Sequence, residues 1–216
     1  MKIVNLTEQN SVANQYLKEM RSVEIQKDPL RFRQNIIRLG EILGYEISKT
    51  FDYSAETIQT PLAETKVDTI VDNVVIATIL RAGLPYHQGF LNIFDRAENA
   101  FVSAYRKYIS ENDFDIHIEY IASPRIDGKT LIITDPMLAT GGSMELAYKA
   151  LLSKGKPKRV IFASIISTEE ALDNLEKIFG DEVETWTIAI DPILNEHKYI
   201  VPGLGDAGDL AYGEKE

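Results

Sequence analysis

Five short, almost continuous apolar runs restrict the possible folds of this chain more than any other feature. They cover residues 74–80, 100–104, 131–133, 160–166 and 186–190. Runs of this length are typical of strands that are buried on both faces of a sheet. Helical patterns occupy residues 143–153 and 167–179, and Ser167 with Glu170 has the spacing of a capping box at the start of the second. The alternation predicts an α/β fold in which helices flank a mostly parallel central sheet.

The N-terminal part, up to about residue 70, is predicted to be a helical extension of this fold. Asp28 and Pro29 are typical of a helix start, because Asp caps free N–H groups and Pro suits the first helical position. Apolar residues then recur at roughly helical spacing, at Ile36, Ile37, Ile42 and Leu43.

Residues 114–120 show a different pattern, in which apolar and polar side chains alternate. Alternation predicts a strand with one wet face, and Asp127 with Gly128 predicts a turn before the run at residues 131–133. We therefore expect a β-hairpin flap over about residues 105–128, with its tip near residues 108–113.

Composition limits the class of protein. The 216 residues contain no internal repeat or linker, so we expect one domain over residues 1–216. The lack of cysteine excludes disulfides, a thiol nucleophile and thiolate metal ligands. A net charge of −10 disfavours non-specific binding to nucleic acid, so any phosphate site must be built locally. No signal peptide and no membrane-spanning apolar window are recognised, and a cytoplasmic protein is expected.

Residues 131–143 form the most informative segment, with the sequence LIITDPMLATGGS ahead of a helix-forming run. In an α/β sheet, a loop between a strand and a helix lies at the carboxyl end of the strand, where ligands usually bind. Gly141 and Gly142 allow backbone N–H groups to approach a ligand closely. Thr140 and Ser143 add hydroxyl donors near the positive end of a helix dipole, and the combination suits a phosphate monoester.

Asp135 precedes these glycines by about one loop-length and is held extended by Pro136. Its carboxylate could accept hydrogen bonds from two ribose hydroxyls, so that phosphate and sugar would be bound together. Taken alone, the segment is explained equally well as a plain connection between strand and helix. It is not a P-loop, because the pattern G-x-x-x-x-G-K-[ST] is absent, and a nucleotide hydrolase is disfavoured for that reason.

Two arginines follow predicted strands. Arg81 comes directly after the run at residues 74–80, and Arg106 follows the run that begins at residue 100. Each guanidinium carries a permanent charge and fixed donors that suit phosphate oxygens, so two converging arginines could hold a pyrophosphate. A salt-bridged or solvated arginine at the end of a strand is the plainer interpretation of either one.

Near the C-terminus, residues 203–208 match G-x-G-x-x-G formally. A dinucleotide-binding unit is excluded, because the chain that follows is too short for its helix and second strand. A flexible glycine-rich terminus is the competing interpretation. The three histidines, His87, His117 and His197, lack the spacing of a zinc site, and structural roles are expected for them.

The segments just described resemble one family. DPMLATGGS at residues 135–143 resembles the phosphoribosyl pyrophosphate (PRPP) signature of type I phosphoribosyltransferases, in the form found in uracil phosphoribosyltransferases. The Asp-Pro pair, in place of two adjacent acids, is typical of that branch. ILRAG at residues 79–83 and YR at residues 105–106 resemble its pyrophosphate-facing elements, and YIVPGLGDAGD at residues 199–209 resembles its uracil-recognition loop. The resemblance runs from about Thr78 to the C-terminus, with a departure near Gln88.

The resemblance implies the type I phosphoribosyltransferase fold and an enzyme of pyrimidine salvage, which transfers the phosphoribosyl group of PRPP to uracil and yields UMP and pyrophosphate. It implies catalytic roles for Arg81, Arg106, Asp135 and Asp206. It implies PRPP binding by Arg81, Arg106, Asp135, Pro136, Met137, Leu138, Ala139, Thr140, Gly141, Gly142, Ser143 and Asp206. Uracil would be bound by the loop at residues 199–209, through Ile200, Gly205, Asp206 and Ala207.

The resemblance also implies Mg²⁺ held mainly through PRPP, a homodimer or higher homo-oligomer, and GTP as an effector. Two alternatives remain open from the residues. The chain could be a phosphoribosyltransferase for another base, which would differ mainly in the C-terminal loop. It could also be a noncatalytic regulator with the same fold that binds RNA, although the charge of −10 disfavours this.

Overall fold

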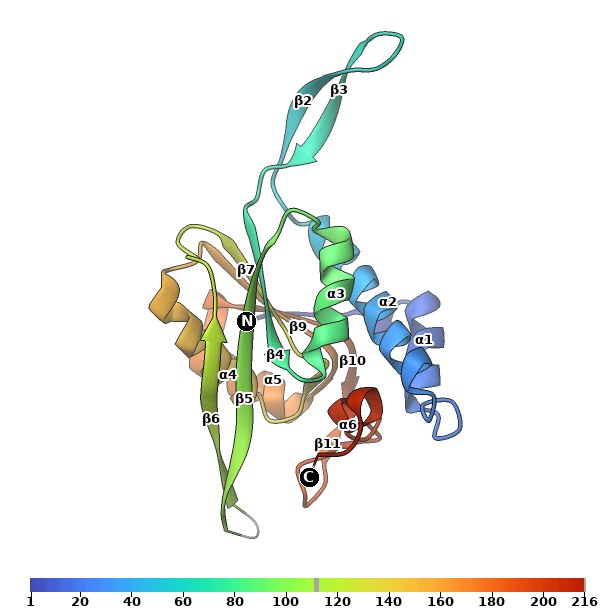
Figure 1. Ribbon diagram of the computed structural model, residues 1–216, viewed down its shortest axis with the longest axis vertical. Coiled ribbons are helices and arrows are strands. Elements are labelled where there is room, and N and C mark those ends of the chain that lie inside the picture. Colours follow the sequence, from blue (N-terminus) through green and yellow to red (C-terminus); the bar gives the residue numbers. More distant parts are fainter. Residues whose placement is uncertain (111–112, 216) are drawn as a thin grey trace.

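A mostly parallel β-sheet forms the centre of the computed structural model, which describes residues 1–110 and 113–215, with the side chains of residues 104–119 left out (Figure 1). In these ranges the strands lie in the order β1 (Lys2–Asn5), β10 (Glu184–Asp191), β9 (Arg159–Thr168), β7 (Thr130–Thr134), β4 (Val74–Leu80), β5 (Glu98–Ser110) and β6 (Asp113–Ala122). The short β8 (Met137–Leu138) pairs with the end of β9. Each neighbouring pair is parallel except β5 and β6.

The predicted parallel sheet is confirmed, and each of the five apolar runs lies in one of its strands. Every residue of β7 is buried, as are six of the seven residues of β4. Thr78 on β4 pairs with Thr134 on β7, and Thr134 pairs with Ala163 on β9. This register brings the carboxyl ends of the central strands to one edge of the sheet, where the segments after them meet.

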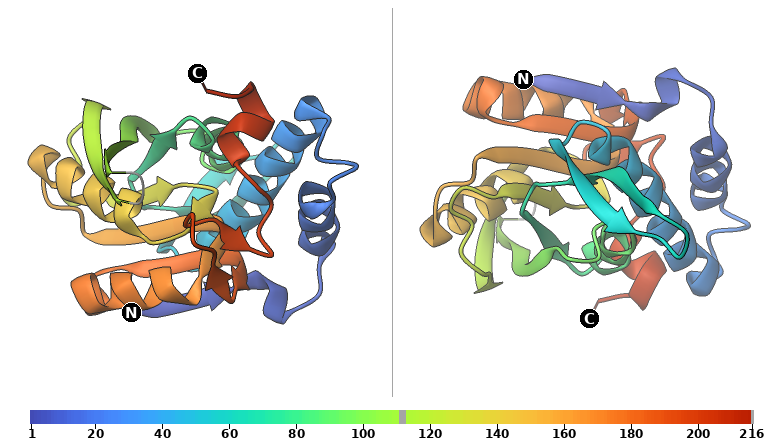
Figure 2. Two further views of the ribbon diagram at one scale, coloured as in Figure 1. Left: turned by 90° about the horizontal axis from the view of Figure 1, so that it is seen from below. Right: turned by 90° about the horizontal axis from the view of Figure 1, so that it is seen from above.

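Helices cover both faces of the sheet (Figure 2). The helices α2 (Pro29–Ser48) and α3 (Gly83–Ile93) pack on one face in a cluster that includes Ile76 of β4, and α1 (Val12–Arg21) lies outside α2. The helices α4 (Gly142–Leu151) and α5 (Glu169–Phe179) pack on the other face in a cluster that includes Val75. Neighbouring residues of one strand thus fill two separate cores, which is why the strands are apolar throughout. No helix of the described part has the length and apolarity to span a bilayer.

The helix expected after Asp28 is confirmed as α2. The Asp28 carboxylate accepts hydrogen bonds from the backbone N–H groups of Leu30 and Arg31 at 3.0 and 3.1 Å, and Pro29 is the first helical residue. The four apolar residues used to predict this helix fall within its bounds.

The prediction of a helical part up to about residue 70 is confirmed for α1 and α2 but was wrong for residues 2–5 and 53–70, which form strands. The strand β1 joins the main sheet, and β2 (Tyr53–Gln59) pairs with β3 (Glu64–Ile70) in an antiparallel hairpin that projects from the body (Figure 1). All seven residues of β2 are exposed, and Leu62 in the connecting turn is 95% exposed. Because the hairpin has no buried face, its sequence lacks the apolar periodicity from which strands are predicted. We call residues 53–70 the arm.

The expected β-hairpin flap is present as β5 and β6, which extend the edge of the main sheet. Part of its predicted tip, residues 111–112, lies outside the described residues. The predicted turn also forms, since Lys129 N–H donates to Ile126 O at 3.1 Å and Gly128 has φ 66°. It leads into β7 in the middle of the sheet, so it connects the flap to the core.

The predicted capping box at Ser167 and Glu170 was wrong by one residue. Thr168 is the N-cap of α5, and its Oγ1 accepts a hydrogen bond from Ala171 N–H at 3.0 Å. Ser167 still belongs to β9, where its hydroxyl lies 2.7 Å from that of Ser164. Pairing with β10 continues through Thr168, and this tertiary contact extends the strand beyond its apolar run.

A charged cluster joins the two N-terminal helices. Glu19 on α1 accepts hydrogen bonds from Arg31 Nε at 2.9 Å and Nη2 at 2.8 Å, and from Asn35 Nδ2 at 2.8 Å. The bonds from Arg31, and then that from Asn35, lower the pKa of Glu19 from 4.5 to about 2. The cluster therefore favours the folded state only while Glu19 is ionised.

We predict that Glu19→Gln lowers the urea midpoint at pH 7, and that its difference from the parent protein shrinks as the pH falls from 4.5 toward 2. A carboxylate whose folded-state pKa is depressed stabilises the protein above its ordinary pKa and loses that effect on protonation. Urea unfolding of both proteins between pH 7 and pH 3 measures the difference. An unchanged difference across that range would contradict the assignment.

Candidate active site

The loop after β7 forms a cradle that opens toward the start of α4. Gly141 is the residue before α4 and has φ 84°, a conformation that glycine adopts readily. Gly141 has no side chain to cap the helix, and among the described residues only Gly142 N–H meets a side-chain acceptor, the Thr140 hydroxyl, so the N–H groups of Ser143 and Met144 keep their capacity to bind a ligand. A small cavity of about 40 Å³ adjoins them. It is lined by Asp135, Met137, Leu138, Ala139, Thr140, Gly141, Ser143 and Met144.

Two predicted members of the cradle do not line this cavity. Pro136 lies with its carbonyl toward β9, where it accepts hydrogen bonds from Ile165 N–H and Ile166 N–H at 3.0 Å. Gly142 N–H points to the hydroxyl of Thr140 at 3.4 Å. Pro136 therefore anchors the loop to the sheet, and the other predicted cradle residues surround the cavity.

Asp135 stands at the entrance to the loop, half-buried. Its backbone N–H donates to Ala163 O on β9 at 3.1 Å, and its Oδ1 accepts a hydrogen bond from Met137 N–H at 3.3 Å. Both bonds fix the direction of the carboxylate relative to the cavity that it lines.

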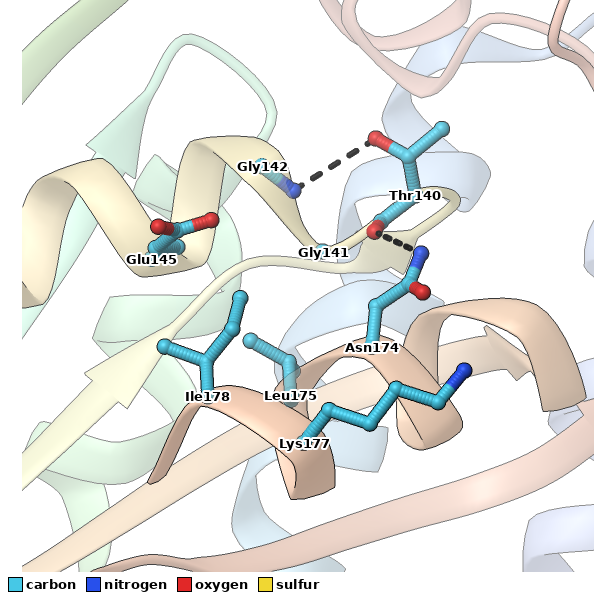
Figure 3. Close-up of a pocket in the computed structure, with 8 residues that line it drawn as sticks. All are labelled: Thr140, Gly141, Gly142, Glu145, Asn174, Leu175, Lys177 and Ile178. Atoms are coloured by element: carbon cyan, nitrogen blue, oxygen red, sulfur yellow. Dashed lines mark hydrogen bonds between the residues drawn. The ribbon is translucent and has the colours of Figure 1, made fainter. Parts of the chain in front are cut away.

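A larger cavity of about 250 Å³ lies where the same loop faces α5 (Figure 3). Asn174 on α5 reaches the loop, and its Nδ2 donates to Thr140 O at 3.4 Å. A Cβ atom built on Gly141 would lie 3.1 Å from Leu175 Cγ, so α5 packs directly against the back of the cradle. Asn174 was not found from the sequence, because nothing in its surroundings distinguishes it from other polar residues of a helix.

Arg81 emerges from the carboxyl end of β4 and faces the C-terminal segment. Its Nη2 donates to Asp209 Oδ1 at 2.8 Å and to Gly213 O at 3.3 Å. Its Nε is buried and makes no hydrogen bond to any residue in the described ranges. The plainer interpretation, a salt-bridged arginine at the end of a strand, thus describes part of its environment, and one buried donor remains available.

The helix α3 follows Arg81 immediately and was not predicted. Pro85 and two glycines weaken its helical signal, and no side chain caps its start. A Cβ atom on Gly83 would lie 2.2 Å from Thr78 Oγ1 and 3.4 Å from Thr134 O, so only glycine lets the helix begin this close to the ends of β4 and β7. Gln88 lies on the exposed side of α3, where its amide donates to Asn92 at 2.9 Å.

The C-terminal segment is folded, and the interpretation of a flexible terminus was wrong. After β12 (Ile200–Val201), which pairs with β11 (Ile193–Leu194), residues 207–212 form the helix α6 (Ala207–Tyr212). Leu204, Ala207 and Ala211 are buried in the core cluster that also contains α2. The C-terminal segment therefore contributes apolar residues to the core.

An ion pair at the end of β10 anchors this segment. Asp191 accepts two hydrogen bonds from Arg21, at 2.7 and 2.8 Å, and one from Gly203 N–H at 2.9 Å. Arg21 also donates to Gly203 O at 3.0 Å. Neither residue was found from the sequence. The signal for Asp191 was available, since an acid directly follows the apolar run at residues 186–190.

The predicted uracil residues lie along this anchored segment. Ile200 and Ala207 are buried, whereas Gly205 is exposed and has φ 91°. Asp206 is half-buried and caps α6, because its Oδ1 accepts a hydrogen bond from Asp209 N–H at 3.0 Å.

Arg81 and Asp206 meet at one place. A Cβ atom built on Gly208 would lie 3.1 Å from Asp206 Oδ1 and 3.6 Å from Arg81 Nη2. The structure thus brings one predicted arginine together with the C-terminal segment, at the edge of the sheet where the cradle opens. Arg106 lies on β5, on the strand of the flap, and its side chain is outside the described residues.

Two buried titratable groups next to the site keep their neutral forms. Burial lowers the pKa of His87, whose Nε2 lies 2.7 Å from Asn99 Oδ1, so it packs as a neutral core residue. Burial, with a smaller contribution from the charge of Asp135, raises the pKa of Tyr86 well above its usual value. His197 is exposed, and the side chain of His117 lies outside the described residues.

We predict that Asp206→Ala lowers the free energy of unfolding by about 1 kcal/mol, because α6 loses its N-cap. Asp206→Asn keeps an acceptor oxygen at the same position and should retain most of this stability. Urea unfolding of the parent and the two variants gives the comparison. Equal stability of the alanine variant and the parent would show that the cap contributes nothing.

Comparison with known proteins identifies the family. The model of the family described as uracil phosphoribosyltransferase matches residues 7–214. A relative from Porphyromonas gingivalis, named uracil phosphoribosyltransferase, is 60% identical over 215 residues, and the alignment covers the whole of both chains. A relative of the same name from Pyrococcus furiosus is 39% identical over 190 residues, which are 87% of this chain and 81% of that one.

A solved structure shares the fold over nearly the whole chain. The structure of the AQ2163 protein from Aquifex aeolicus superimposes with a TM-score of 0.87 and 31% sequence identity, and the match covers 98% of each chain. The family match over nearly the whole length and the identity to the curated relatives show that the chain belongs to the uracil phosphoribosyltransferase family.

Proposed function

We propose that the edge of the sheet just described carries out the reaction of this family, in which PRPP and uracil give UMP and pyrophosphate. The bond from uracil N1 to the anomeric carbon of the ribose forms as the bond from that carbon to pyrophosphate breaks. Pyrophosphate leaves with the electron pair of the broken bond, and the N1 proton passes to water. One observation carries the proposal. The start of α4, Asp135 and Arg81 lie at the same edge of the sheet, beside the folded C-terminal segment. No protein nucleophile is required.

In this proposal the 5-phosphate of PRPP binds in the cradle, with the ribose hydroxyls on Asp135. Backbone N–H groups at a helix start and an adjacent hydroxyl are suitable donors for a phosphate dianion. The small cavity, which both Asp135 and the cradle residues line, supports the idea that one ligand touches both. This fixes the sugar, and positioning supplies a large part of the acceleration.

Arg81 is proposed to bind the pyrophosphate. Negative charge grows on the leaving group in the transition state, and a guanidinium held in place stabilises that charge. The buried Nε of Arg81, which makes no hydrogen bond among the described residues, supports this role. Arg106 is proposed as the second arginine, carried by the flap, which would shield the activated sugar from water.

Uracil is proposed to bind along residues 200–207, mainly to backbone groups. Uracil presents a fixed set of donors and acceptors, and a rigid segment that matches them leaves groups of cytosine unpaired. Rigidity is supported by the Asp191 anchor and by the packing of Ala207 in the core. The contact of Arg81 with Asp209 supports a position of the base next to the pyrophosphate.

Mg²⁺ is proposed to arrive on PRPP. Among the described residues, no group of three or more His, Asp or Glu side chains is placed so that it could hold a metal ion. Mg²⁺ is commonly bound through one or two carboxylates, substrate phosphates and water. Asp135, which lines the small cavity, and Asp206, which lies close to Arg81, are the carboxylates proposed to contribute, and the ion would neutralise part of the charge of the pyrophosphate.

A panel of bases tests the proposed function and its first rival, a phosphoribosyltransferase for another base. We predict that pyrophosphate is released from PRPP with uracil and not with cytosine, orotate or hypoxanthine. Turnover with another base at a rate like that of uracil would overturn the specificity. Failure of every base to support turnover would favour the second rival, a noncatalytic RNA-binding regulator.

Asp206→Asn, which keeps the helix cap, should lower turnover with uracil and leave the urea midpoint nearly unchanged.

The cellular compartment, the effector and the oligomeric state are also proposed. We propose a cytoplasmic enzyme, because a chain without cysteine is compatible with a reducing compartment. GTP is proposed as an effector on the ground of the resemblance, and turnover with and without GTP measures it. A homo-oligomer is proposed on physical grounds, because a two-stranded hairpin is marginally stable alone in water and the arm is exposed along its length.

We predict that the arm makes the contact between subunits. Leu62→Asp, at its tip, should shift the protein toward the monomer in sedimentation velocity. Val23→Asp is the matched control, since Val23 is also exposed and apolar but lies between α1 and α2. A parent protein that is monomeric, or a variant with unchanged assembly, would contradict the prediction.

A further inference from the structure

Two side chains behind the cradle hold consecutive carbonyl groups of its loop. Thr168, at the end of β9, is fully buried, and its Oγ1 donates to Ala139 O at 2.6 Å. Asn174, on α5, donates through Nδ2 to Thr140 O at 3.4 Å (Figure 3). The two carbonyls belong to the peptides 139–140 and 140–141, which lie at the centre of the cradle.

The geometry of the peptide bond gives these contacts a consequence on the other side of the loop. Both peptides are trans, and in a trans peptide the C=O and the following N–H point in opposite directions. With Ala139 O drawn toward Thr168, the N–H of Thr140 points away from β9. With Thr140 O drawn toward Asn174, the N–H of Gly141 points away from α5. Thr140 and Gly141 line both cavities, but residues of α5 line only the larger one, so N–H groups that point away from α5 face the smaller cavity.

The two N–H groups are available there. Within the described part of the chain, neither Thr140 N–H nor Gly141 N–H donates a hydrogen bond to another residue. Rotation of either peptide would replace an N–H with a carbonyl oxygen, which repels a phosphate. The conformation that suits an anion is thus one of two that the glycine-rich loop could adopt, and the two side chains select it.

We propose that Thr168 and Asn174 are positioning residues for the 5-phosphate of PRPP, which they affect only through the orientation of these two peptides. The inference rests on the proposed placement of that phosphate in the cradle. Thr168 has the larger effect on the orientation of the loop, because its hydrogen bond is shorter and buried, whereas Asn174 is partly exposed. A hydrogen bond from a loop N–H group to the phosphate has a charged acceptor and is therefore strong. The loss of one such bond should weaken phosphate binding about tenfold or more.

The variants separate positioning from stability. Thr168→Val removes the donor to Ala139 O together with the cap of α5, whereas Thr168→Ser keeps both. Asn174→Ala removes the second donor and touches no helix cap. Lys177→Ala is the matched control, because Lys177 lines the same larger cavity and, within the described part of the chain, donates no hydrogen bond to the loop carbonyls.

The measurements are the KM values for PRPP and uracil, kcat, the affinity for ribose 5-phosphate by calorimetry, and the urea midpoint. We expect Thr168→Val to raise the KM for PRPP and the Kd for ribose 5-phosphate about tenfold to a hundredfold, with the KM for uracil within about twofold. Asn174→Ala should raise the same two values several-fold. Thr168→Ser should restore them, and Lys177→Ala should leave them unchanged.

Two results would overturn the inference. One is unchanged ribose 5-phosphate affinity in both Thr168→Val and Asn174→Ala. The other is an equal rise of the KM for PRPP and for uracil alongside a lowered urea midpoint, which would make the role purely structural. If Thr168→Val does not fold, Asn174→Ala decides alone. A parent protein that binds no ribose 5-phosphate and releases no pyrophosphate would instead defeat the proposed function itself.

Discussion

The parallel pairing of β4, β7 and β9 is the constraint on which the site depends. Because Thr78, Thr134 and Ala163 lie in register, the chain leaves all three strands at the same edge. Arg81 follows the first strand, Asp135 follows the second, and Thr168 ends the third. Residues far apart in the sequence therefore meet without a long loop, and the two buried cores on either face keep the strands in place.

A second layer of contacts turns this edge into a defined surface. Asp191 and Arg21 fix the C-terminal segment to the end of β10, and Asp209 ties the start of α6 to Arg81. These interactions are local. The net charge of −10 repels phosphates at a distance, so attraction must come from oriented N–H groups, helix ends and single arginines held a few ångströms from the ligand.

The sequence was informative wherever a signal is local. Continuous apolar runs predicted the strands, Asp28 with Pro29 predicted the start of α2, and the strand-glycine-helix pattern predicted the cradle. The arm, α3 and α6 were missed, because the arm has no buried face, α3 contains a proline and two glycines, and α6 has only 6 residues. The contacts of Arg81 with Asp209 and of Arg21 with Asp191 join segments more than 120 residues apart, and no single-sequence pattern specifies such pairs.

The Asp191 anchor bears on how a new base selectivity could arise. If the base is read mainly by backbone groups, substitution of the side chains beside it changes few of the contacts that distinguish one base from another. The path of the segment is set instead by Asp191 at the end of β10 and Arg21 at the end of α1, which both bind the backbone of Gly203. Selectivity would then evolve through residues that redirect the main chain, and engineering that randomises only the contact positions would search the wrong part of the protein.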